Sequence, residues 1–141
     1  MIDSMLAEAR AKIDRLPPAE ALSAVRSGGA LILDIRSDTA REHGVVPGSI
    51  HVPRTVFEWR VDPASRWCNP HIGGTDRRLL VLCDHGYSSS LAAATLVDFG
   101  FAAGDVIGGF DAWRDEGLPV VRPTRVRPSG ELPGMGPPEP F

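Results

Sequence analysis

Short apolar runs alternate with helix-forming segments along this chain, and this alternation restricts the folds open to it. Residues 30–34 and 79–82 are almost wholly apolar and are bounded by glycine or charged residues, which is typical of strands buried on both faces. Residues 19–25 follow two prolines and precede two glycines, which predicts a helix. Strands separated by helices indicate an α/β fold with a parallel sheet.

Weaker signals predict the remaining elements. We expect helices at residues 37–43, 91–97 and 110–116, one or two helical turns at 5–13, strands at 49–52 and 105–107, and a polar loop at 61–76. Residues 121–141 contain six prolines and three glycines and no periodic apolar face. The chain therefore divides into a partly helical N-terminal extension (1–15), one domain (16–120) and a Pro/Gly-rich C-terminal tail (121–141) that we expect to be mobile.

Composition narrows the possible partners and compartment. The chain has 141 residues, 43% of them hydrophobic, and a net charge of -3, which is ordinary for a globular protein and disfavours nucleic acid as a partner. The first fifteen residues carry six charges and no apolar run is long enough for a bilayer, so we expect a cytoplasmic protein without membrane contact. Two cysteines, Cys68 and Cys83, cannot form a disulfide framework.

Cys83 is the first candidate for catalysis because of its position. It directly follows the apolar run at 79–82, and ligands of open parallel sheets bind beyond the carboxyl ends of the strands. Between Cys83 and the alanine-rich helix lie Asp84, His85, Gly86, Tyr87, Ser88, Ser89 and Ser90.

This loop has the composition of an anion site. Gly86 can adopt positive φ, so the loop can curl around the sulfur and direct backbone N–H groups toward it. Together with the helix N-terminus, these groups favour a thiolate and a negatively charged sulfur species attached to it. We expect Ser88 and Ser89 to add hydroxyl donors; the alternative is a buried structural cysteine beside serines that cap a helix.

Four motifs occur in a characteristic order. They are Asp34-Ile35-Arg36, residues 43–53, the Cys83 loop, and residues 106–120. Over about residues 16–120 the chain resembles the rhodanese (sulfurtransferase) family, specifically its small single-domain members. The resemblance implies a central parallel five-stranded sheet flanked by helices on both faces.

The resemblance also implies an activity. The Cys83 thiolate would take a sulfane sulfur from a donor such as thiosulfate, a persulfide or a polysulfide, and pass it to cyanide or a thiol acceptor by covalent catalysis. We expect no cofactor. We also expect no metal, because the spacings of Cys68, His71, Cys83 and His85 match none of the usual zinc patterns.

The loop departs from many family members, which carry an arginine inside it. Here Asp84 and Ser88 occupy the second and sixth loop positions. An exposed Asp84 would repel a dianion such as thiosulfate, which favours a neutral or monoanionic donor, including a protein persulfide. Arg54 and Arg60 follow the strand at 49–52 and are possible substrate-binding residues, although ordinary surface or ion-pair roles are also open.

Two other functions use the same cysteine. Phosphatases of this fold hold phosphate with an arginine placed after five intervening residues, but Ser89 stands there in this chain and no aspartic general acid is evident. A protein-to-protein sulfur carrier or interaction module with little small-molecule turnover is the stronger alternative. The sequence does not choose between a carrier and a free-standing sulfurtransferase.

Overall fold

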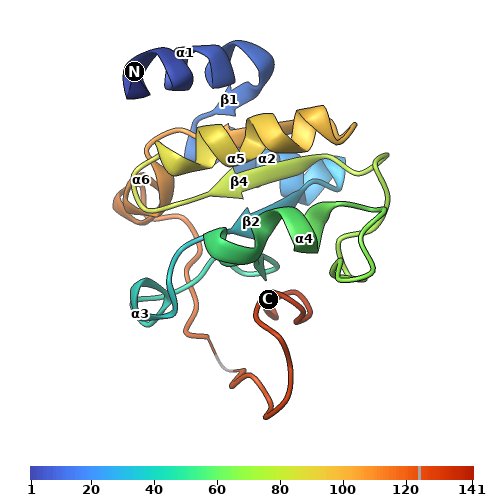
Figure 1. The fold of residues 1–141 in the computed structure, drawn as a ribbon. Coiled ribbons are helices and arrows are strands. Elements are labelled where there is room, and N and C mark those ends of the chain that lie inside the picture. The colour runs from blue at the N-terminus through green and yellow to red at the C-terminus, as the bar shows by residue number, and fades with distance from the viewer. Residues whose placement is uncertain (124) are drawn as a thin grey trace.

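A five-stranded parallel sheet forms the centre of the molecule in a computed structural model that describes residues 1–123 and 125–141 (Figure 1). The strands lie in the order β1-β5-β4-β2-β3. The elements in chain order are α1 (Ile2–Lys12), β1 (Asp14–Leu16), α2 (Pro18–Gly28), β2 (Leu31–Asp34), α3 (Asp38–Arg41), β3 (Ile50–His51), a 3₁₀ turn (Arg54–Val56), α4 (Phe57–Val61), β4 (Leu79–Leu82), α5 (Ser88–Asp98), β5 (Ala103–Val106) and α6 (Gly109–Asp115).

Strand register determines where the site can form. Asp34 at the end of β2 lies opposite Leu82 at the end of β4, and β5 runs parallel to β4 on its other side. The carboxyl ends of these strands therefore meet at one edge, and the residues that follow them share that edge. Cys83 follows β4 there, between the chain after β2 and the chain after β5.

Helices cover both faces of the sheet because every residue of β2 and β4 is buried. One face packs against α4 and α5 and the other against α2 and α6. The outer surface of α5 is covered in turn by α1 (Figure 1). The expected α/β architecture with five parallel strands is confirmed, and the strands and helices expected between residues 19 and 116 form with bounds shifted by a few residues.

The largest departures from the sequence prediction lie at the N-terminus and before the polar loop. The helix α1 has eleven residues rather than one or two turns, and β1 was not predicted at all. This strand pairs only with β5 at the edge of the sheet, so its residues lack the apolar run of a central strand. The boundary that the sequence placed at residue 15 runs through β1, and the short helix α4 was also missed.

The C-terminal segment lies against the domain. Val121 pairs with Val45, and near the end of the chain Glu139 exchanges two backbone hydrogen bonds of 2.8 Å with Gly48 and Ser49. The buried Asn69 amide donates to the carbonyls of Gly134 and Gly136, both at 2.9 Å. Backbone hydrogen bonds, which leave no periodic apolar pattern in the sequence, thus hold this segment. Its mobility stays a prediction.

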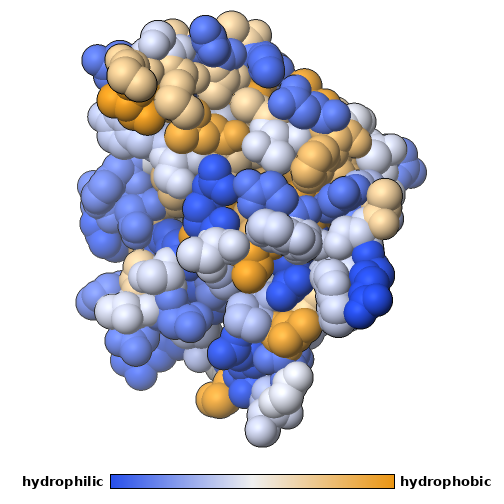
Figure 2. Space-filling view, viewed as in Figure 1, coloured by the Kyte–Doolittle hydropathy of each residue, from blue (hydrophilic) through white to orange (hydrophobic). Residues whose placement is uncertain are grey.

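The surface carries scattered apolar side chains. In Figure 2 one apolar group lies over the N-terminal end of α1, where Met1, Ile2 and Met5 are exposed. Within the described part of the chain, no helix combines the length and the apolar character that crossing a bilayer requires.

Candidate active site

The sulfur of Cys83 lies at the bottom of a tight loop. The residue is 7% exposed, and its Sγ accepts the backbone N–H of Gly86 at 3.2 Å and that of Ser89 at 3.4 Å. The second donor belongs to the first turn of α5, where unpaired N–H groups give the helix its positive end. Two backbone donors therefore point at the sulfur, an arrangement suited to an anion.

The loop carbonyls bind partners outside the curl. The first turn of α6 donates to the carbonyl of Cys83 from Phe110 at 2.8 Å and to that of Asp84 from Asp111 at 3.2 Å. The Gly86 carbonyl accepts hydrogen bonds from two arginine side chains. Because these carbonyls are occupied on the outside, N–H groups of the loop are left to face the sulfur.

Two glycines permit this arrangement. Gly86 has φ +87°, and a Cβ there would lie 2.7 Å from the backbone nitrogen of Gly108. Gly109 has φ +64°, and a Cβ there would lie 2.5 Å from the carbonyl oxygen of Cys83. The loop and the start of α6 therefore approach each other more closely than any side chain allows.

The side chains of the loop mostly face outward. Asp84, His85 and Ser88 are exposed and Tyr87 is 63% exposed. The His85 ring Nδ1 lies 2.9 Å from the Asp111 carboxylate. Solvent therefore reaches the rim of the loop, while the sulfur beneath it is largely enclosed.

Ser89 takes a role different from the one expected. Its side chain is buried, and its hydroxyl donates to Asp105 at 2.8 Å. The hydroxyl therefore does not face the sulfur as expected; the backbone N–H of Ser89 is the group that donates to the Cys83 Sγ. The reason lies in the turn of α5, which directs the side chain toward β5.

Arg54 lies at the same edge of the sheet as Cys83. It lines a cavity of about 320 Å³ together with Ile35, Arg36 and His51. The backbone N–H of Ile35 donates to the carbonyl of Leu82, the residue before Cys83. A substrate-binding role for Arg54 stays a prediction that this position supports.

Arg60 is placed differently. It is 6% exposed, and its guanidinium donates to the carbonyl of Pro133 at 2.6 Å and to that of Trp67 at 3.2 Å. These contacts hold the C-terminal segment and an adjacent loop. In the structure Arg60 is a structural residue, and the tertiary fold does not bring it to the Cys83 loop.

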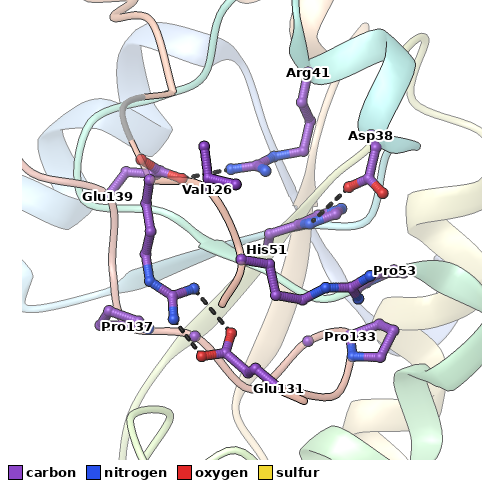
Figure 3. A pocket seen from close by; sticks show the side chains of 13 residues that line it. Asp38, Arg41, His51, Pro53, Val126, Glu131, Pro133, Pro137 and Glu139 are labelled. Carbon is purple, nitrogen blue, oxygen red and sulfur yellow. Dashed lines mark hydrogen bonds and ion pairs between the residues drawn. The ribbon is translucent and has the colours of Figure 1, made fainter. Parts of the chain in front are cut away.

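A second cavity, of about 330 Å³, lies between the C-terminal segment and the region of α3 and β3 (Figure 3). Across it Arg41 pairs with Glu139 at 2.7 Å. His51 also lines it, and burial together with the nearby Arg41 lowers the pKa of His51 below its ordinary value of 6.5. The His51 Nε2 lies 2.7 Å from the carbonyl of Arg36, so it carries the proton in the neutral ring.

Cys68 lies in the loop between α4 and β4, before the amino end of β4, whereas Cys83 follows its carboxyl end (Figure 1). Both cysteines are free thiols. Among the described residues, no three His, Cys, Asp or Glu side chains gather as metal ligands.

Three residues around the loop were not singled out from the sequence. Arg10 and Arg15 bind the Gly86 carbonyl, and the buried Asp105 binds Ser89 and Arg15. More than seventy residues separate the arginines from Gly86, and no sequence spacing signals such a contact. The only available signal is a charged residue inside the β5 strand, since a fully buried acid requires partners.

Comparisons with known proteins agree with this geometry. The rhodanese-like domain family matches residues 17–116. A thiosulfate sulfurtransferase GlpE of Pseudomonas syringae pv. syringae is 37% identical over 101 residues, which is 71% of this chain and 86% of that protein. A thiosulfate sulfurtransferase GlpE of Stutzerimonas stutzeri is also 37% identical, over 71% of this chain and 84% of that protein.

A solved structure from Rhodopseudomonas palustris superposes with a TM-score of 0.78 at 36% identity, covering 86% of this chain and 94% of that one. It is described as a protein of unknown function, RPA3614, and as a possible tyrosine phosphatase. In the present chain, the position where such a phosphatase would carry its arginine is Ser89, whose hydroxyl is bound to Asp105.

Proposed function

This chain belongs to the rhodanese-like domain family, and on that premise we propose that it is a sulfurtransferase in which Cys83 carries the transferred sulfur as a persulfide. The observation that carries this proposal is the pair of backbone N–H groups, from Gly86 and Ser89, on the Cys83 sulfur. A persulfide anion extends one sulfur beyond Sγ and requires the same kind of donor.

The chemistry is a double displacement. The Cys83 thiolate attacks the outer sulfur of thiosulfate, a Cys–S–S bond forms, and the S–S bond of thiosulfate breaks so that its electron pair leaves with sulfite. In the second half, cyanide or a thiolate attacks the terminal sulfur of the persulfide, and the Cys83 thiolate departs. Neither half needs a cofactor or an oxidant, and sulfite leaves at neutral pH without a proton.

Thiosulfate is the donor that the names of the relatives support. The charge of Asp84 affects how readily thiosulfate binds at the loop. Asp84 is an exposed residue of the loop itself, and among the described residues its carboxylate takes part in no ion pair. A carboxylate there repels a dianion through solvent. We expect Asp84→Ala to raise kcat/KM for thiosulfate by about threefold and to leave kcat/KM for an uncharged polysulfide donor unchanged.

The matched control for that variant is Asp76→Ala. Asp76 is an exposed acid in the loop before β4, so its removal changes the net charge equally at a distance from the Cys83 loop. Equal effects of the two substitutions, or no gain with either, would remove the repulsion argument.

The test of the proposed function is the intact mass of the protein. Wild type incubated with thiosulfate or with polysulfide should gain the mass of one sulfur atom, and cyanide should remove it. Cys83→Ser should gain none, whereas Cys68→Ser should behave as wild type does.

Two outcomes contradict the proposal in different ways. Sulfur uptake that persists in Cys83→Ser would assign the chemistry to another residue. Uptake only from a persulfidated protein, and from no small donor, would favour the carrier alternative. The rim of the loop is open to a protein partner, since Tyr87 there is 63% exposed.

A further inference from the structure

Two arginines from the N-terminal part of the chain converge on one carbonyl of the Cys83 loop. The Gly86 carbonyl accepts Nη2 of Arg10 at 2.9 Å and Nη2 of Arg15 at 3.0 Å. The N–H of the same glycine donates to the Cys83 sulfur at 3.2 Å. Gly86 is therefore held by the sulfur through one of its backbone groups and by two cations through the other.

Asp105 orients one of these arginines and the start of α5. It is fully buried in β5, and its carboxylate accepts Nε of Arg15 at 2.9 Å. The same carboxylate accepts the hydroxyls of Ser89 at 2.8 Å and Ser90 at 2.7 Å. One buried acid thus links the arginine on Gly86 to the helix turn whose N–H reaches the sulfur.

Arg10 is fixed by separate contacts. Its Nε donates to the Ser90 hydroxyl at 3.1 Å, and its guanidinium lies 5.6 Å from the centre of the Tyr87 ring. The helix that carries it packs along α5. Arg10 therefore reaches Gly86 from a rigid element and not from a free terminus.

We propose that Arg10 and Arg15, oriented in part by Asp105, are positioning residues that hold the loop in the form required for sulfur transfer; this inference rests on the proposed function. No cis peptide bond occurs among the described residues, and across a trans peptide the Gly86 carbonyl and the Tyr87 N–H point in opposite directions. Holding that carbonyl on the arginines therefore turns the Tyr87 N–H away from them. The loop keeps its donors oriented before the anion forms.

The two arginines also supply charge that the loop lacks. Residues 83–90 contain Asp84 but no lysine or arginine. Asp105 balances one of the two cations on Gly86, and the other offsets the charge of Asp84. Positive charge on Gly86 favours both the persulfide anion and the sulfite that leaves thiosulfate.

Arg10→Met is the first variant, because it removes one of the two donors to the Gly86 carbonyl while leaving the ion pair of Arg15 and Asp105 intact. Its matched control is Lys12→Met, which removes a cation from the same helix; Lys12 pairs with Asp98 at 3.5 Å and both side chains are at least half exposed. We expect Arg10→Met to lower kcat by about tenfold per folded molecule, with KM for thiosulfate less affected. Arg10→Lys should restore most of kcat.

Arg15 requires a different variant because its removal alone would leave Asp105 buried without its cation. The double substitution Arg15→Met with Asp105→Asn removes both charges and keeps an acceptor for the serine hydroxyls. We expect the same loss of kcat as in Arg10→Met. If this double variant does not fold, Arg10→Met still decides the question.

Hydrogen exchange of loop residues 84–89 gives a readout that is independent of sulfur chemistry. It should be faster in Arg10→Met and unchanged in Lys12→Met. If Arg10→Met speeds exchange or lowers stability but leaves kcat unaltered, Arg10 has only a structural role and the inference is overturned. Exchange in Arg10→Met equal to that of wild type overturns it as well. If wild type takes up no sulfur, the proposed function fails, whereas the exchange comparison still decides whether Arg10 holds the loop.

Discussion

Replacing Gly86 by alanine tests whether close backbone packing shapes the Cys83 loop. Two costs arise, and the structure separates them. The first is the left-handed backbone at φ +87°, which costs a residue with a Cβ about 1 kcal/mol. The second is the contact of that Cβ with the Gly108 nitrogen at 2.7 Å. The atoms nearest to this Cβ are all backbone atoms of Gly108 and Gly109, so the loop or the start of α6 must shift, which adds about 2 kcal/mol.

Gly29→Ala is the matched control. Gly29 follows α2 with φ +70°, and nothing lies within 4 Å of a Cβ placed there. Only the conformational cost of about 1 kcal/mol applies to it. We therefore expect the free energy of unfolding of Gly86→Ala to be about 2 kcal/mol below that of Gly29→Ala.

The assay is urea unfolding of the three proteins together with the rate of sulfur uptake from thiosulfate. Gly86→Ala should also lose at least about tenfold in that rate, because the N–H of residue 86 moves away from the Cys83 sulfur. Gly29→Ala should keep the wild-type rate. If the two variants unfold at the same urea concentration and react equally fast, the close approach does not constrain the loop and the reasoning is refuted.

Three further predictions concern the surroundings of the site. Arg36→Met should lower the free energy of unfolding by about 2 kcal/mol, measured in urea, because the buried Asp34 loses the guanidinium now 2.8 Å away and keeps only the longer contact with Arg41 at 3.4 Å; a loss below about 1 kcal/mol would contradict this. Burial and Arg41 lower the pKa of His51 in the folded protein, so just below pH 6.5 the unfolded state binds more protons than the folded state. The free energy of unfolding should therefore fall as pH decreases there, and in His51→Gln it should fall less between pH 7 and 5. Asn69→Ala removes two hydrogen bonds to the C-terminal segment, so limited proteolysis should cut that segment faster than in wild type, with sulfur uptake from thiosulfate unchanged.

The sequence predicted the centre of the molecule well because buried parallel strands leave a strong signal. The runs in β2 and β4 are apolar at nearly every position and end where charge or chemistry begins. Cys83 could be singled out as the candidate reactive residue for the same reason: a cysteine beyond such a strand and before a glycine lies at the edge where ligands bind. The loop composition then indicated backbone donors, which the structure places on the sulfur.

The roles of individual side chains could not be predicted from the sequence as reliably as the strands. Arg54 and Arg60 are both basic and lie close together in the sequence, yet one lines a cavity at the carboxyl edge of the sheet and the other holds the C-terminal segment. Arg60 lies in the short helix α4 and Arg54 lies before it, so the two side chains point in different directions; α4 gave no clear sequence signal. Hydroxyl donation by Ser89 failed as an expectation because a helix turn, and not the identity of the residue, decides where its side chain points.

The sequence by itself therefore determined the α/β class, the order of the central elements and the position of the candidate cysteine at the carboxyl edge of the sheet, since these depend on local patterns of burial and turn formation. Only the tertiary structure decided which distant groups complete the loop. The contacts of Arg10 and Arg15 with Gly86 arise because β1 joins the far edge of the sheet and α1 packs on α5. Such contacts depend on the whole fold. In the sequence, a charged residue whose partner is distant along the chain cannot be told from an ordinary charged surface residue.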